Sequence, residues 1–154
     1  MTFADVISAL SKELGTEIEI EENTSAVRTG ADGQKSVTIL LQGFDERRAL
    51  LMTADIGQPP PERLERLYRE ILEANDLFMD TGGATLSLIP TTGNIRLQRF
   101  DPSDVIAEAG TSKALILFAN VAAAWAKLVS DYRDVPREDE TKTSNDGNLL
   151  GVRV

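Results

Sequence analysis

Carboxylates are the main side chains in this sequence that could act as catalysts or metal ligands. The 154-residue chain contains 25 aspartates and glutamates but no histidine and no cysteine. Histidine acid–base catalysis, thiolate nucleophiles, disulfides and the usual zinc ligands are therefore excluded. An enzyme built from the remaining carboxylates, hydroxyls, lysines and tyrosines would need a pair of acids or a carboxylate-bound metal.

Two groups of acids lie close together in the sequence, and neither has the spacing of a site. The first group alternates with apolar residues and indicates one solvated face; it consists of Glu17, Glu19, Glu21 and Glu22. A metal there would need further carboxylates from elsewhere in the fold. The second group, REDE at 137–140, lies in a polar stretch and is typical of a soluble tail. We therefore expect no catalytic residue, no metal and no cofactor, and predict that the protein is not an enzyme.

The charge balance restricts the class of partner. Acidic residues outnumber basic ones 25 to 16, for a formal net charge of −9. Such a surface repels the phosphates of nucleic acids, so basic or weakly charged protein partners fit it better. The loop TGADGQK at 29–35 also lacks the spacing of a Walker phosphate loop.

The first half of the chain has the pattern of one helix followed by strands. Apolar residues recur at helical spacing between a capping Thr2 and Gly15; they are Phe3, Val6, Ile7, Leu10 and Leu14. Residues 16–22 alternate with period two and predict a strand, and a weak strand follows near 26–29. Residues 35–42 and 48–56 predict two longer strands joined by a tight loop.

The second half predicts a helix, a hairpin and a final helix. The segment 57–80 begins with prolines, carries an apolar stripe and is stopped by Gly82 and Gly83. ATLSLIP and IRLQRF then pair around the turn TTGN, and an almost wholly apolar helix runs over 112–132. Trp125 in that helix is expected to pack inside. Six segments, the weak one near 26–29 included, carry a strand signal. The predicted fold class is α+β, an antiparallel five-stranded sheet with three helices in the order α-β-β-β-α-β-β-α.

Domain organisation follows from a change of composition near residue 133. Residues 1–133 predict one domain, and 134–154 predict a mobile polar tail. The closing LLGVRV, at 149–154, is apolar again and either folds back onto the domain or a partner, or is an ordinary end. The first residues lack the basic region of a signal peptide, and the apolar run 114–126 is too short to span a bilayer. We expect a cytoplasmic protein without membrane insertion.

The middle of the chain resembles a known family. EILEAN at 70–75, the short apolar DLFMD, the Gly-Gly pair at 82–83 and the strands ending in IRLQRF are similar to the class I type III secretion chaperones, the Tir chaperone (CesT-like) family. The order of elements matches over 3–132, and the residue matches lie within 70–100. The loop at 29–35 departs from the family pattern and would lengthen the second-to-third strand connection.

The resemblance implies a homodimer that binds the N-terminal chaperone-binding segment of a secreted effector in extended form and keeps it soluble for export. Family dimers form through the second helix and the fourth strand, which carries over here to Leu64, Leu67, Ile71, Leu86 and Leu88. Cargo binds apolar patches around the first helix and the sheet, sometimes as an added strand. The partner-binding candidates are Phe3, Val6, Ile7, Leu10, Ile18 and Ile20, with Arg99 as a pair for a cargo acid.

Each of these residues also has a structural interpretation. The stripe of the second helix could be core or interface, Ile7 and Leu10 are core in part, and Phe3, Val6, Ile18 and Ile20 could be either core or groove. A different function on the same fold is a regulatory module that sequesters an anti-activator or other small intracellular protein. A small carboxylate-dependent hydrolase is more remote.

Overall fold

A computed structural model describes residues 1–29 and 36–132 of the chain. The five strands form one sheet in the order β1-β2-β3-β5-β4, with all neighbours antiparallel. The strands are β1 (Thr24–Thr29), β2 (Val37–Phe44), β3 (Ala49–Gly57), β4 (Thr85–Leu88) and β5 (Ile95–Pro102). The predicted α+β class and the five-stranded antiparallel sheet are confirmed. The predicted tail at 134–154 and most of the loop at 29–35 lie outside the described residues.

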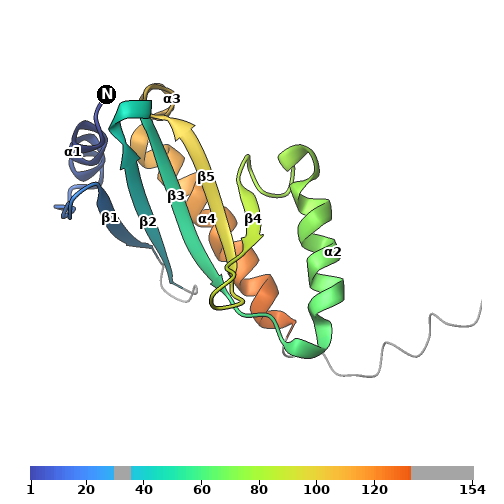
Figure 1. Cartoon of the computed structure of the whole chain (residues 1–154). Helices are drawn as coiled ribbons and strands as arrows, with labels where there is room; N and C mark the ends of the chain where they lie inside the picture. The colour runs from blue at the N-terminus through green and yellow to red at the C-terminus, as the bar shows by residue number, and fades with distance from the viewer. Residues whose placement is uncertain (30–35, 133–154) are drawn as a thin grey trace, which may run out of the picture.

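Four α-helices accompany the sheet in the described part of the chain, one more than predicted. They are α1 (Phe3–Leu14), α2 (Leu64–Asn75), α3 (Ser103–Ala109) and α4 (Thr111–Asp131). Figure 1 shows α4 running behind the sheet, α1 beside the β1–β2 end and α2 standing beside β4 at the opposite edge. The helix that sequence patterns missed is α3, which is only seven residues long and offers too few turns for a periodic signal.

Helix α1 begins and ends as the sequence predicts. The Thr2 hydroxyl accepts the Asp5 N–H at 3.2 Å, the Asp5 carboxylate accepts the Thr2 N–H at 2.9 Å, and Gly15 closes the helix at φ 65°. Phe3 lies directly against β2, where a Cβ on Gly43 would come within 2.3 Å of the Phe3 Cβ. The glycine therefore lets the helix approach the strand.

The strand predicted at 16–22 is wrong. Residues 17–20 have no regular structure, and Glu21 makes a single bridge to Thr24. Side chains take the place of a strand partner here, because Ser11 Oγ accepts the Ile18 N–H at 3.2 Å and the Ser25 hydroxyl donates to the Glu19 carbonyl at 2.6 Å. The first strand of the structure is β1, which lies where the sequence carries the weak strand signal near 26–29.

Helix α4 supplies much of the core. Its buried side packs against β2 and β3 through an apolar row that includes Leu115, Phe118, Ala122, Trp125 and Val129. Helix α4 is long enough and apolar enough, with a mean hydropathy of 1.4, to meet the length and composition criteria for a membrane-spanning helix. Core helices meet the same criteria, and this helix buries one side in the domain.

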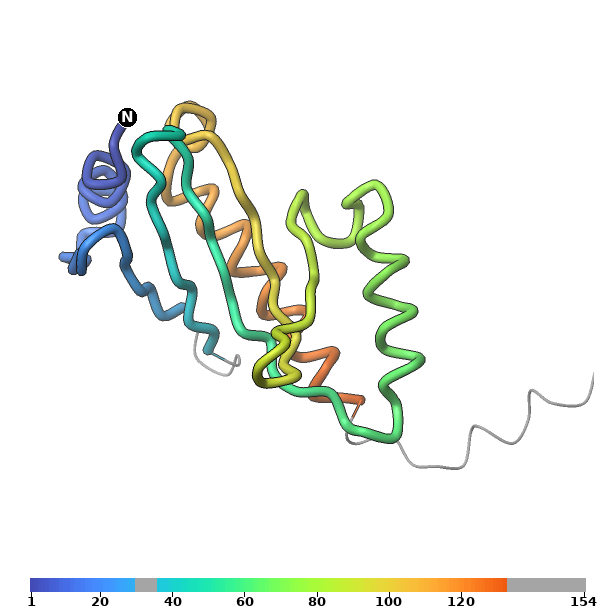
Figure 2. Tube along the Cα trace, viewed as in Figure 1, coloured from blue at the N-terminus to red at the C-terminus, as the bar shows by residue number. Residues whose placement is uncertain are grey.

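The predicted helix at 57–80 is divided into three pieces. Pro61–Arg63 and Asp76–Phe78 are 3₁₀ turns, and α2 lies between them. Leu77 and Phe78 have left-handed backbone, with φ of 52° and 55°, so the regular helix ends at Asn75 rather than at the glycines. Figure 2 shows the chain turning back from this point towards β4.

Candidate functional site

The sheet has one covered and one open face. Along β2 and β3 the buried residues alternate with more exposed ones, and the helices cover the buried side. Leu40 and Phe100 on the open face remain 54% and 51% exposed. Phe44 meets Phe100 edge to face at 5.7 Å between ring centroids, and Leu51 is the cross-strand neighbour of Phe100. The open face therefore carries a small apolar patch formed by Phe44, Leu51 and Phe100, and Leu40 lies farther along β2.

A groove of about 520 Å³ lies along the edge strand β1. Ile18, Val27 and Leu40 contribute apolar surface. The charged residues of its lining are Glu17, Glu19, Glu21 and Arg28, so acids predominate. Among the described residues, strand β1 has a strand neighbour on one side only. An extended peptide could pair with such an edge while its side chains enter the groove, and the glutamates would favour basic residues in it.

A second apolar surface lies at the other end of the sheet. Leu64, Tyr68 and Leu72 are four residues apart and share one side of α2, and Leu72 is 71% exposed. The turn after α2 adds the exposed side chains of Leu77, Phe78 and Met79. Exposed apolar side chains gathered at one end of the sheet make this surface a candidate for contact with another chain.

The structure divides the five dimer candidates by burial. Leu67, Ile71 and Leu86 are buried within the protomer, where they fix α2 against β4. Leu64 is half-buried, and Leu88 is 47% exposed at the end of β4. Of the five candidates, Leu64 and Leu88 are thus the ones that another chain can contact directly. Leu67, Ile71 and Leu86 hold α2 and β4 in place beneath that surface.

The partner-binding candidates divide in the same way. Phe3, Val6, Ile7 and Leu10 form the buried side of α1 and belong to the protomer core. Ile18 is half-buried and Ile20 is 42% exposed, both in the segment beside β1. A partner can therefore touch the last two without rearrangement, whereas contact with the four residues of α1 would require that helix to move.

Arg99 already has partners within the protomer. Its guanidinium pairs with the Asp101 carboxylate and donates to the Gly82 carbonyl at 3.2 Å. Arg99 lies opposite the buried Met52, on the helix-covered side of β5. Pairing with an acid of another chain would have to compete with the Asp101 carboxylate.

Several surface residues had no signal in the sequence. Leu40, Leu51 and Phe100 lie in strands that carry apolar residues on both faces, so the pattern does not mark the exposed ones. Leu72 could have been found, because it continues the four-residue spacing from Leu64 and Tyr68.

Two ionisable groups near the ends of α4 have shifted pKa values. The hydrogen bonds from Ser112, including its backbone N–H at 2.7 Å, lower the pKa of Glu13 and let this α1 residue cap α4. At the other end, burial raises the pKa of Tyr132 to about 12, with a further contribution from Glu70. Within residues 1–29 and 36–132 no three acidic side chains are grouped as metal ligands would be.

Comparison with known proteins places this geometry in a family. The model of the Tir chaperone protein (CesT) family matches residues 5–125. Among curated proteins, none matches the chain.

Solved structures share the fold at low sequence identity. A chain of the HopA1–SchA chaperone–effector complex is 14% identical with a TM-score of 0.61, and the match covers 84% of this chain and 93% of that one. A chain of the heterodimeric ExoU–SpcU complex from the type III secretion system of Pseudomonas aeruginosa is 12% identical with a TM-score of 0.59, covering 82% and 95%. A chain of the ExsC–ExsE complex is 17% identical with a TM-score of 0.56, covering 81% and 91%.

Proposed function

The chain belongs to the Tir chaperone protein (CesT) family, and we propose that it is a cytoplasmic type III secretion chaperone. In this proposal it binds the N-terminal segment of a secreted effector in extended form and keeps that segment soluble until export. Such a role needs apolar surface and a strand edge rather than a catalytic group. The structural neighbours from chaperone–effector complexes support it.

The observation that carries the proposal is the acid-lined groove beside the edge of β1. Its apolar surface can cover alternate side chains of an extended segment at about 25 cal/mol per Å² buried, against the cost of ordering that segment. Glu17, Glu19 and Glu21 add a negative field that favours a basic segment and speeds its encounter.

We propose in addition that the working form is a homodimer joined through α2 and β4. The support is the exposed apolar surface formed by Leu72, the turn at 77–79 and Leu88. A two-fold contact uses the same patch on both copies, so one self-complementary apolar surface is sufficient. The groove beside β1 lies at the opposite edge of the sheet from this surface (Figure 1), and each protomer would keep its groove free.

The test is co-expression with N-terminal fragments of candidate effectors, followed by gel filtration with mass measurement. We expect a stable complex that contains a dimer of this chain and an effector fragment. Binding of the purified fragment should weaken with added salt, because the groove acids are exposed. Failure of every effector fragment to form a complex would contradict the proposal. Capture of a small intracellular protein instead would favour the regulatory alternative.

A matched pair of variants assigns binding to the groove. Glu19→Lys changes the groove, whereas Glu108→Lys makes the same charge change at an exposed position on α3. We expect Glu19→Lys to weaken binding roughly five-fold, or about 1 kcal/mol, and Glu108→Lys to have a much smaller effect. Equal effects would show only a loss of net charge and would remove the groove from the proposal.

A further inference from the structure

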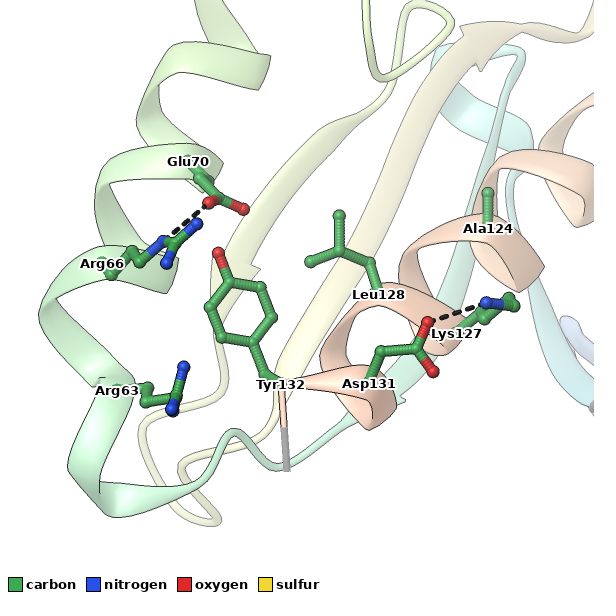
Figure 3. A pocket seen from close by; sticks show the side chains of 8 residues that line it. All are labelled: Arg63, Arg66, Glu70, Ala124, Lys127, Leu128, Asp131 and Tyr132. Atoms are coloured by element: carbon green, nitrogen blue, oxygen red, sulfur yellow. Dashed lines mark hydrogen bonds and ion pairs between the residues drawn. The ribbon is translucent and has the colours of Figure 1, made fainter. Parts of the chain in front are cut away.

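A second groove runs between α2 and α4. It lies on the side of α2 that faces away from Leu64, Tyr68 and Leu72. It consists of two hollows of about 500 Å³ and about 330 Å³, which share Glu70, Ala124 and Leu128 and are therefore contiguous. Figure 3 shows the larger hollow, with α2 on one side, α4 on the other and the Tyr132 ring between them. Hollows of roughly 300–1,000 Å³ are large enough to bind small ligands and side-chain groups.

The charges in this groove are separated along its length. Arg63, Arg66 and Lys127 line the hollow that contains Tyr132, together with Glu70 and Asp131, which leaves an excess of one positive charge. Glu73 and Asp80 line the hollow that lies farther from Tyr132, next to Trp125 and Ala74. The groove is therefore basic where α4 ends and acidic towards the turn after α2, with Ala124 and Leu128 as apolar surface in both parts.

Arg66 and Lys127 at the basic end can accept a further partner. Arg66 pairs with Glu70 at 3.4 Å and its guanidinium lies 5.9 Å from the centroid of the Tyr132 ring, yet its side chain is 69% exposed. Lys127 pairs with Asp131 at 2.7 Å and is 76% exposed. Exposed pairs of this kind are weak, and each cation has several donors, so a third carboxylate can join them.

The chain itself supplies a segment that fits this pattern. Residues 133–154 follow directly from Tyr132 at the basic end. They carry Arg133, Asp134 and Arg137, then the acidic run at 138–140, then Lys142 and Asp146, and they finish with LLGVRV, which is apolar with one arginine, Arg153. The acidic run comes before the arginine of the apolar end, and the order of these two features is the complement of the order along the groove.

The length of the segment permits this contact. From Tyr132 back to Trp125 is seven residues of helix, or roughly 10 Å. The 16 residues between Tyr132 and Leu149 can reach about 55 Å when extended. The segment can therefore leave α4, turn and return over the groove without strain.

We propose that residues 149–154 of the same chain bind in the groove between α2 and α4. Leu149, Leu150 and Val152 cover the apolar surface of Ala124 and Leu128, and Arg153 pairs with Glu73 or Asp80 at the acidic end. The acidic run at 138–140 meets the cations beside Tyr132. This contact uses the side of α2 opposite the proposed dimer surface, so the segment and a second copy can bind at the same time. The proposal does not depend on the proposed function.

Disulfide trapping tests the proposal directly, because the chain has no cysteine of its own. Ala124→Cys, at an exposed position in the groove, is combined with Leu150→Cys in the full chain. The control combines Leu150→Cys with Lys113→Cys, which is exposed on the same helix but eleven residues away, or roughly 16 Å. We expect mild oxidation to give an intramolecular disulfide in the first protein at least ten-fold faster than in the control.

The mass of the trapped product identifies the occupant. A disulfide within one chain supports the proposal. A disulfide between two chains would overturn it in favour of a segment supplied by a second copy, and equal trapping in the control would overturn it in favour of random encounters. Arg153→Glu should slow the trapping several-fold and the added change Glu73→Arg should restore it. A rate insensitive to Arg153→Glu would overturn the pairing of Arg153 with the acidic end.

Discussion

The side chain of Asn75 occupies both backbone hydrogen-bonding groups of Leu86. Its Nδ2 donates to the Leu86 carbonyl at 3.0 Å, and its Oδ1 accepts the Leu86 N–H at 2.9 Å. Asn75 is the last residue of α2, and Leu86 lies in the outermost strand, β4. One amide thus joins the end of α2 to β4 and closes part of an edge that would otherwise be open to another strand.

Asn75→Ala is therefore expected to lower the free energy of unfolding by about 2 kcal/mol. The variant loses two hydrogen bonds, and the partly buried N–H and carbonyl groups of Leu86 are left without a partner. Urea unfolding followed by circular dichroism measures the change. Asn120→Ala, an exposed position on α4, is the matched control and should change stability by less than about 0.5 kcal/mol. Similar losses in both variants would contradict the assigned role of Asn75.

Gly43→Ala should detach α1 from the sheet. The added methyl group would lie 2.3 Å from the Phe3 Cβ, an atom close to the backbone that cannot turn away. We expect a loss of about 3 kcal/mol in the free energy of unfolding. Gly15→Ala is the comparison, because no atom lies within 4 Å of its added Cβ and the only cost is the left-handed backbone, about 1 kcal/mol. A Gly43→Ala protein as stable as the Gly15→Ala protein would refute the close approach of Phe3.

Leu72→Glu should convert the proposed dimer into a monomer. A charge in the centre of an apolar contact surface is costly to bury, whereas on the free protomer Leu72 is 71% exposed and can be replaced with little effect. Light scattering after gel filtration should show half the mass, with an unchanged circular dichroism spectrum. The control is Leu117→Glu, at a 52% exposed position on α4, which should leave the mass unchanged. A Leu72→Glu protein of unchanged mass would place the contact elsewhere.

Glu13 should contribute a pH-dependent part of the stability. Its hydrogen bonds with Ser112 lower its pKa from the ordinary 4.5, so the ionised form favours the folded state. The contribution is present above pH 4.5 and is lost as the pH falls through the lowered value. Glu13→Gln should therefore lower the melting temperature at pH 7, and the difference from the original protein should diminish in acid.

The control for this measurement is Glu108→Gln, at an exposed position on the neighbouring α3. It should leave the melting temperature at pH 7 nearly unchanged. A Glu13→Gln difference that stayed constant from pH 7 down to acid would mean that the carboxylate charge does not cap α4.

The sequence determined where most elements lie, because their signals are local. Thr2 and Gly15 mark the ends of α1 through contacts within a few residues, and the alternation in 95–100 belongs to β5. Local signals were insufficient at 16–22. There the residues do alternate, but a hydrogen bond from the Ile18 N–H to Ser11 and one from the Ser25 hydroxyl to the Glu19 carbonyl replaced the strand partner that the pattern requires.

Only the tertiary structure decided which apolar side chains stay uncovered. Ile71 and Leu72 are adjacent in α2 and equally apolar, yet one is buried and the other is 71% exposed. The difference arises because α2 packs against β4, and β4 lies at the sheet edge through its pairing with β5. Pairing between strands joins residues that are distant in the chain, so no pattern within a helix can determine which of its sides the sheet will cover.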